Sequence, residues 1–265
     1  MNIYIQELKS LFKSILIWTI SIVGLIIFLF AVYPGLAKDA DKFMLLLENY
    51  PPEVLSAFGA TIDLATSING YYAFCLVYIN LCAAIQAMKS GVDVLAKESS
   101  RKTCDFIFVK PVSRTKVLVS KLAAAITSFL ITDIFIIPIA IISAIVVETK
   151  DFDIKVFLLI SISIIFVQLI FAALGFFCAA IAKKIKGTTA VSLGTVMAFF
   201  TISLIVNAFG DDKLKYISFL TYFSPNYIIV NGYFELRMLI CTVAVIVLFI
   251  AISLFYYNKK DIHSA

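Results

Sequence analysis

Residues 15–33 read ILIWTISIVGLIIFLFAVY, nineteen consecutive residues without a charged side chain. A helix needs about 20 largely apolar residues to cross the hydrocarbon core of a bilayer, so this stretch predicts a transmembrane helix. The competing interpretation is a signal peptide, because Gly35-Leu36-Ala37 places small residues at a cleavage-like spacing. The apolar stretch is longer than the roughly 7 to 15 residues of a signal core, which favours a helix that stays in the membrane.

The composition of the whole chain leads to the same conclusion. Of its 265 residues, 62% are hydrophobic and 15% are charged, and the mean hydropathy is +1.02. A soluble protein of this length could not cover so much apolar surface. We therefore predict an all-α integral membrane protein, a single transmembrane domain over residues 1–265. Its six transmembrane helices are expected at residues 15–33, 68–88, 122–147, 156–182, 190–209 and 238–257.

Three segments outside these spans also have apolar patterns. Residues 1–13 place apolar side chains on one helical stripe, which predicts an N-terminal amphipathic helix in the membrane interface. Residues 43–47 and 54–58 are short apolar pieces separated by Pro51-Pro52, which predicts two short helices on the outer side. The aromatic stretch 219–233, broken at Ser224-Pro225-Asn226, predicts a re-entrant outer segment. Its Tyr222, Phe223, Tyr227 and Tyr233 are interpreted either as a release gate or as interfacial anchors.

Basic residues give the orientation of the chain. If both termini lie on one side, fifteen of the 22 Lys and Arg residues lie on that side as well, whereas eleven of the 17 acidic residues lie on the other. Loops rich in Lys and Arg stay in the cytoplasm. We therefore expect both termini to be cytoplasmic, and the charge pattern to reflect the membrane rather than a nucleic-acid partner.

The sequence offers no pattern for catalysis by this chain. It has no glycine-rich loop ending in Gly-Lys-Ser or Gly-Lys-Thr, which a nucleotide-hydrolysing site needs. Its single histidine, His263, lies in the polar tail, and the five cysteines lack the paired spacing of a metal or redox motif. The paired carboxylates Asp151/Asp153 and Asp211/Asp212 lie in exposed loops, where we interpret them as solvated side chains rather than as a catalytic pair. We expect neither an enzyme nor a metal site.

Residues 91–116 form the most charged segment, GVDVLAKESSRKTCDFIFVKPVSRTK. Residues 92–99 predict one short helix, residues 103–109 a second, and Pro111 turns the chain toward the third span. Such a bent pair of helices would be the main polar surface on the cytoplasmic side. The simpler alternative is a solvated loop that follows the positive-inside bias.

The same segment resembles the cytoplasmic signature of ABC-2-type permeases, the membrane subunits of many bacterial ABC transporters. In that family a Glu is followed by a Gly-Thr or Thr-Thr pair, an apolar piece and Pro-Val-Ser-Arg. Here Glu98 is followed by the apolar piece 106–109 and Pro111-Val112-Ser113-Arg114. This sequence departs from the family pattern at Lys102-Thr103-Cys104, where the family often has a glycine or a second threonine. The resemblance extends to the amphipathic start, the six spans, the outer motif Pro52-Glu53-Val54-Leu55 and the long segment before the last span.

The resemblance implies a half-transporter in a bacterial cell membrane. The bent pair of helices in residues 91–116, a cytoplasmic elbow between the second and third spans, would dock on a separate ATP-binding cassette subunit, with its first short helix as the coupling helix. That subunit would hold ATP and magnesium. This chain would bind no cofactor. A second permease copy, identical or related, would complete the membrane part of the transporter, and membrane lipid would surround both copies. The transporter would export a peptide, an antibiotic or a lipid-like molecule. The implied coupling residues are Lys97, Glu98, Arg101, Lys102, Asp105, Pro111 and Arg114.

Asp133 is the one acidic residue inside a predicted span. An ionised Asp at the bilayer centre costs roughly 2.5 to 3.5 kcal/mol on insertion scales, so its side chain should face protein or water. It either lines a substrate path, together with Asn80 and Gln168, or it is a structural residue that is protonated or hydrogen-bonded to one of them. An ion-coupled secondary transporter or channel that uses Asp133 is the alternative function. A membrane scaffold or sensor is a third.

Overall fold

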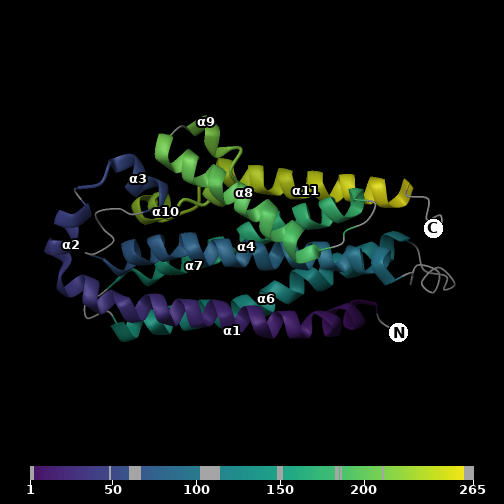
Figure 1. The fold of residues 1–265 in the computed structure, drawn as a ribbon, viewed down its shortest axis with the longest axis horizontal. Helices are drawn as coiled ribbons and strands as arrows, with labels where there is room; N and C mark the ends of the chain where they lie inside the picture. The colour runs from purple at the N-terminus through teal and green to yellow at the C-terminus, as the bar shows by residue number, and fades with distance from the viewer. Residues whose placement is uncertain are drawn as a thin grey trace.

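A computed structural model gives the fold (Figure 1). It describes residues 3–47, 49–59, 67–101, 114–147, 152–182, 185, 187–210 and 212–259, without the side chains of residues 43, 97–101, 114, 212, 258 and 259. Within that part all regular structure is helical, which confirms the predicted all-α class.

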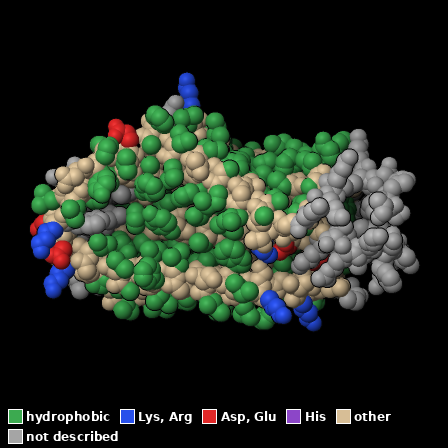
Figure 2. Space-filling view, viewed as in Figure 1, with side chains coloured by type: hydrophobic (Ala, Val, Ile, Leu, Met, Phe, Trp, Pro, Cys, Tyr) green, Lys and Arg blue, Asp and Glu red, His purple; other side chains and the backbone are tan. Residues whose placement is uncertain are grey.

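Among the described residues, six helices are long and apolar enough to cross a membrane, as predicted. They are α1 (Ile3–Lys38), α4 (Ile68–Arg101), α6 (Arg114–Val147), α7 (Ile154–Ile181), α8 (Thr188–Phe209) and α11 (Leu236–Lys259). Each contains the corresponding predicted span, apart from single residues at the ends. Figure 2 shows hydrophobic side chains over the middle of the molecule, where a bilayer would contact it.

The N-terminal prediction was wrong in one respect. We expected a separate interfacial helix over residues 1–13, whereas α1 runs without interruption from Ile3 to Lys38. No proline precedes Pro34 in this helix, so nothing in its backbone forces a break. Part of the apolar stripe faces the protein core, because Leu8 and Leu11 pack into the core of the bundle.

The predicted first short helix over residues 92–99 also differs, because it is the end of α4. Val92, Leu95 and Ala96 are buried, and their packing continues the core face of the span. Gly91, just before this stretch, contacts α7. The predicted second helix, over residues 103–109, lies outside the described residues.

Short helices cover the end of the bundle opposite the termini. The two predicted outer helices are present as α2 (Ala40–Leu47) and α3 (Pro52–Ala57), separated at Pro51. After α8 come α9 (Asp212–Lys215), the 3-10 helix η2 (Phe219–Thr221) and α10 (Pro225–Asn231). The predicted break at residues 224–226 thus falls where α10 begins, with Ser224 preceding its first residue, Pro225. Re-entry into the membrane stays a prediction.

Helices α4 and α7 form the centre of the bundle. Two thirds of the residues in the apolar windows of α4 and α7 are buried, against 17–28% in the other four spans. Both helices meet at glycines: a Cβ on Gly91 would collide with the carbonyl oxygen of Ala172, and one on Gly175 with that of Met88. Small residues of this kind let membrane helices approach closely. Gly91 and Gly175 therefore mark the central contact of the bundle.

The described start of α1 and end of α11 lie at the same end of the bundle, as do the end of α4 and the start of α6 (Figure 1). We call this the inner end and the one that carries α2, α3 and α10 the outer end. A chain that crosses a membrane an even number of times has both ends on the same side, and the positions of the start of α1 and the end of α11 agree with this.

Candidate functional site

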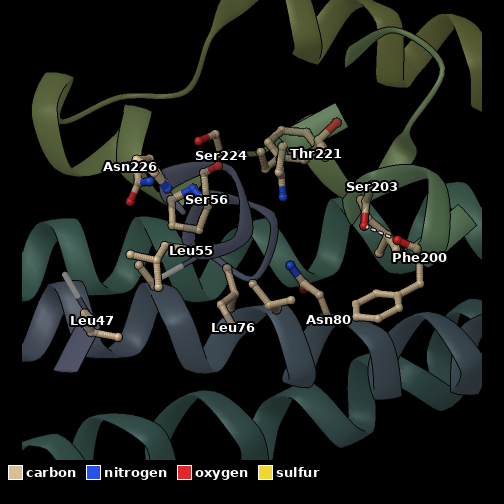
Figure 3. Close-up of a pocket in the computed structure, with 18 of the residues that line it drawn as sticks. Leu47, Leu55, Ser56, Leu76, Asn80, Phe200, Ser203, Thr221, Ser224 and Asn226 are labelled. Atoms are coloured by element: carbon tan, nitrogen blue, oxygen red, sulfur yellow. Dashed lines mark hydrogen bonds between the residues drawn. The ribbon is translucent and has the colours of Figure 1, made fainter. Parts of the chain in front are cut away.

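A cavity with a volume of about 860 Å³ opens at the outer end, between α4, α8, the helices α2 and α3, and residues 220–226. Figure 3 shows α4 below it, with Leu76 and Asn80 pointing up, and Ser56 and Thr221 on the opposite side. None of the described residues that line it carries a charge. The volume lies within the range of small-molecule sites, roughly 300 to 1,000 Å³.

Three asparagines on three different elements bring amide groups to this cavity: Asn80 on α4, Asn207 on α8 and Asn226 on α10. Asn80 is only 5% exposed, and its carbonyl oxygen has no hydrogen-bond partner among the described residues. A buried amide without partners is unfavourable by roughly 1 to 3 kcal/mol. The cavity thus offers, at Asn80, an acceptor that the described part of the fold does not use.

Three hydroxyl groups at the cavity, in contrast, are partnered. Ser203 Oγ donates to the Phe200 carbonyl (2.7 Å) and Thr221 Oγ1 to the Ser218 carbonyl (2.9 Å). Ser56 Oγ donates to the Glu53 carbonyl at 3.1 Å. These groups retain only acceptor capacity toward a ligand.

Aromatic packing fixes the roof of the cavity. Phe223 stacks on Phe166 of α7, with the ring centroids 5.0 Å apart, and Phe234 packs edge-on against both rings. Tyr222 is buried and donates its hydroxyl to the Tyr216 carbonyl at 2.8 Å. Burial raises the pKa of Tyr222 to about 12. The segment is therefore held against α7, and Tyr222 and Phe223 are inward-facing packing residues.

At the inner end a buried lysine joins three helices. Lys121 of α6 is 2% exposed, and its Nζ donates to the Val94 carbonyl of α4 at 2.9 Å. The same Nζ lies 3.2 Å from Glu7 Oε1 of α1. A buried charge requires such partners, because removing one of them typically costs 3–5 kcal/mol. The contact ties the first turns of α1 and α6 to the end of α4.

Further polar contacts extend this connection toward the middle of the bundle. Ser128 Oγ donates to Ser90 Oγ at 3.2 Å, and Gln86 Nε2 donates to Thr132 Oγ1 at 2.7 Å. Thr19 Oγ1 of α1 donates to the same Thr132 oxygen at 3.2 Å. Helices α1, α4 and α6 are thus linked from the inner end to mid-bundle.

The predicted coupling residues fall largely outside the described part. Lys102, Asp105 and Pro111 lie in the segment that the structure does not describe. The backbones of Lys97, Glu98 and Arg101 are helical, as is that of Arg114, but their side chains are not described. Their role in docking stays a prediction.

The three residues predicted for a substrate path are divided by the fold. Asn80 lines the outer cavity, whereas Asp133 and Gln168 do not. Asp133 is 3% exposed, and its carboxyl lies next to the Gln168 side chain. Neither group makes a hydrogen bond of normal geometry with a described residue. The two side chains therefore form a buried polar pair between α6 and α7, away from the cavity.

Sequence reasoning missed Asn207, Asn226 and the Lys121–Glu7 pair. The asparagines could have been noticed as amides in otherwise apolar segments, as Asn80 was. Lys121 was counted only as a cytoplasmic charge, since nothing in a single sequence says which distant acid it meets. Asp153, interpreted as solvated, caps α7 by accepting from the Lys155 and Val156 amides at 2.9 and 3.2 Å.

Comparison with known proteins gives a family. No match to the chain was found among curated proteins. The model of a protein family described as ABC-2 family transporter protein matches residues 1–262, nearly the whole chain. The chain therefore belongs to the ABC-2 family, as a multi-pass membrane permease of an ABC transporter that works with an ATP-binding partner and is not itself the ATPase.

Proposed function

We propose that this chain is one half of the membrane part of a bacterial exporter, driven by an ATP-binding cassette subunit. That subunit docks on the charged segment 91–116, at the part that follows the buried residues 91–96. A second copy of this chain or a related permease completes the membrane part, with both termini in the cytoplasm. ATP and magnesium bind to the partner subunit. The substrate is a peptide, an antibiotic or a lipid-like molecule that leaves between the two permease halves.

The observation that carries the proposal is the course of α4. This helix begins beside the outer cavity, passes Asn80, and continues without interruption to Arg101 at the inner end. A helix of 34 residues is about 51 Å long. The glycine contact fixes α4 to α7, and the Lys121 contact fixes it to α6. Force applied at residues 97–101 would therefore move the wall of the cavity.

Family membership favours this proposal over the ion-coupled transporter that uses Asp133. The position of Asp133 agrees, because its carboxyl lies beside Gln168 and outside the cavity, with no cationic partner among the described residues. We therefore assign Asp133 to the structure of the bundle.

The proposal is tested by isolating the tagged chain from its native cells in mild detergent. We expect an ATP-binding cassette subunit, identified by mass spectrometry, to copurify with the wild-type chain. Glu98→Lys should reduce its yield several-fold, because rim charges set the register of docking. Glu53→Lys, which makes the same charge change on the outer helix α3, is the matched control and should leave the yield unchanged. Equal yields from the two variants, or no such subunit with the wild type, would contradict the proposal.

A further inference from the structure

The outer cavity combines apolar walls with unused amide groups, and this combination restricts what it can bind. Leu76 and Ala73 of α4 and Phe223 of the roof are buried apolar residues that line it. Asn80 adds an amide that is nearly fully buried and lacks a partner for its oxygen. The side chain rises from α4 into the space below residues 221–226 (Figure 3).

The other two amides extend the polar positions across the cavity. Asn207 is half-buried on α8 and Asn226 is exposed on α10, and neither side-chain amide makes a hydrogen bond to a described residue. Each carboxamide provides two donors and two acceptor lone pairs. A ligand that carries both donors and acceptors at intervals, as amide groups do, would pair with all three.

Other ligand classes fit less well. A phosphate, carboxylate or ammonium group would be buried without a counter-charge among the lining residues, which is strongly unfavourable. An acyl chain would fill the apolar part but leave the amide of Asn80 without partners. A polyhydroxylated sugar would place many hydroxyls against leucine and phenylalanine side chains.

We propose that this cavity binds an uncharged, apolar molecule that carries amide groups, of the chemical class of a hydrophobic peptide, through Asn80, Asn207 and Asn226. The proposal deepens the export function proposed above, because it names the substrate class at one site within a single chain. The apolar walls provide affinity, and the three amides provide selectivity for amide-bearing ligands over lipid.

The test measures binding to the purified full-length chain in lipid nanodiscs. The probe is acetyl-trileucine amide carrying an environment-sensitive fluorophore, and its backbone N-methylated form lacks the peptide donors. Empty nanodiscs correct for partition into lipid. We expect the wild-type chain to bind the first probe about tenfold more tightly than the second, as one to two lost hydrogen bonds would give.

Asn80→Leu removes the buried amide while keeping a side chain of similar size. It should weaken binding of the first probe about tenfold and leave the N-methylated probe almost unaffected. Asn231→Leu is the matched control, because Asn231 is exposed on α10 and its amide bonds to the Tyr227 carbonyl outside the cavity. Ser56→Trp places a large ring at the cavity from the exposed face of α3 and should weaken binding of both probes at least tenfold.

Three results would overturn the inference. The first is equal binding of both probes by the wild type, and the second is equal binding of the first probe by the wild type and Asn80→Leu. The third is tighter binding of a fluorescent fatty alcohol than of the peptide, which would make the cavity a lipid site. Because this assay needs no ATPase, its failure is distinguishable from failure of the copurification experiment.

Discussion

The contact between α4 and α7 makes Gly175→Ala the most informative single substitution. A Cβ at Gly175 would meet the carbonyl oxygen of Met88, and it would also lie 3.2 Å from the backbone nitrogen of Val92. Both are backbone atoms of α4, so no side-chain rotation can make room. The two central helices would have to move apart.

The size of the effect follows from two opposing terms. Inserting a methyl group into a packed core costs about 1 to 3 kcal/mol, and the upper end applies here because the obstacle is rigid. Alanine is favoured over glycine within a helix by about 1 kcal/mol. We therefore expect Gly175→Ala to lower the free energy of unfolding by about 2 kcal/mol, and Gly91→Ala to behave alike because of its contact with Ala172.

Reversible unfolding in mixed micelles, followed by circular dichroism, measures this difference. Gly194→Ala is the matched control, since Gly194 also lies in a membrane-spanning helix and a Cβ there would meet nothing within 4 Å. The control should gain up to about 1 kcal/mol, because the helical preference of alanine acts there without an opposing contact. If Gly175→Ala were as stable as Gly194→Ala, α4 and α7 would not be in backbone contact, and their joint movement would have no structural basis.

Three further substitutions test individual contacts. Lys121→Met should lower the unfolding free energy by about 3 kcal/mol because it leaves Glu7 without its cationic partner. Adding Glu7→Gln should recover part of that loss. Purely additive effects in the double-mutant cycle would contradict the ion pair. Asp133→Asn should leave the unfolding free energy unchanged or raise it, since a neutral amide can still face Gln168; a loss above about 1 kcal/mol would reveal a favourable role for the charge. Tyr222→Phe should cost about 1 kcal/mol for the lost hydrogen bond. Because the Tyr222 pKa is raised from 10.0 to about 12, its contribution should be complete below pH 10 and lost as the pH rises through 12, which spectrophotometric titration of the variant and wild type would show or refute.

The six spans could be predicted from the sequence because each is a long apolar run, and membrane insertion depends mainly on such runs. Prolines made the boundaries of the short outer helices predictable, since Pro51 separates α2 from α3 and Pro225 begins α10. These signals are local in the chain.

What the sequence could not provide depends on neighbours distant in the chain. Whether residues 92–99 form their own helix or continue α4 is decided by burial of Val92 and Leu95 against other helices. The cavity arises from several elements, so the meeting of Asn80 with Asn207 and Asn226 depends on how each helix is rotated. The same holds for Lys121 and Glu7, which are 114 residues apart.

The central claim is that the ATP-binding partner drives this permease from the inner end, where α4 ends. The most direct measurement replaces Glu98 with a photo-crosslinking amino acid in living cells, with the same replacement at Glu53 of α3 as the outer-end control. The account predicts a light-dependent crosslink between position 98 and the ATP-binding cassette subunit, and none from position 53. A crosslink to that subunit from position 53, or none from position 98 while the complex copurifies, would contradict it.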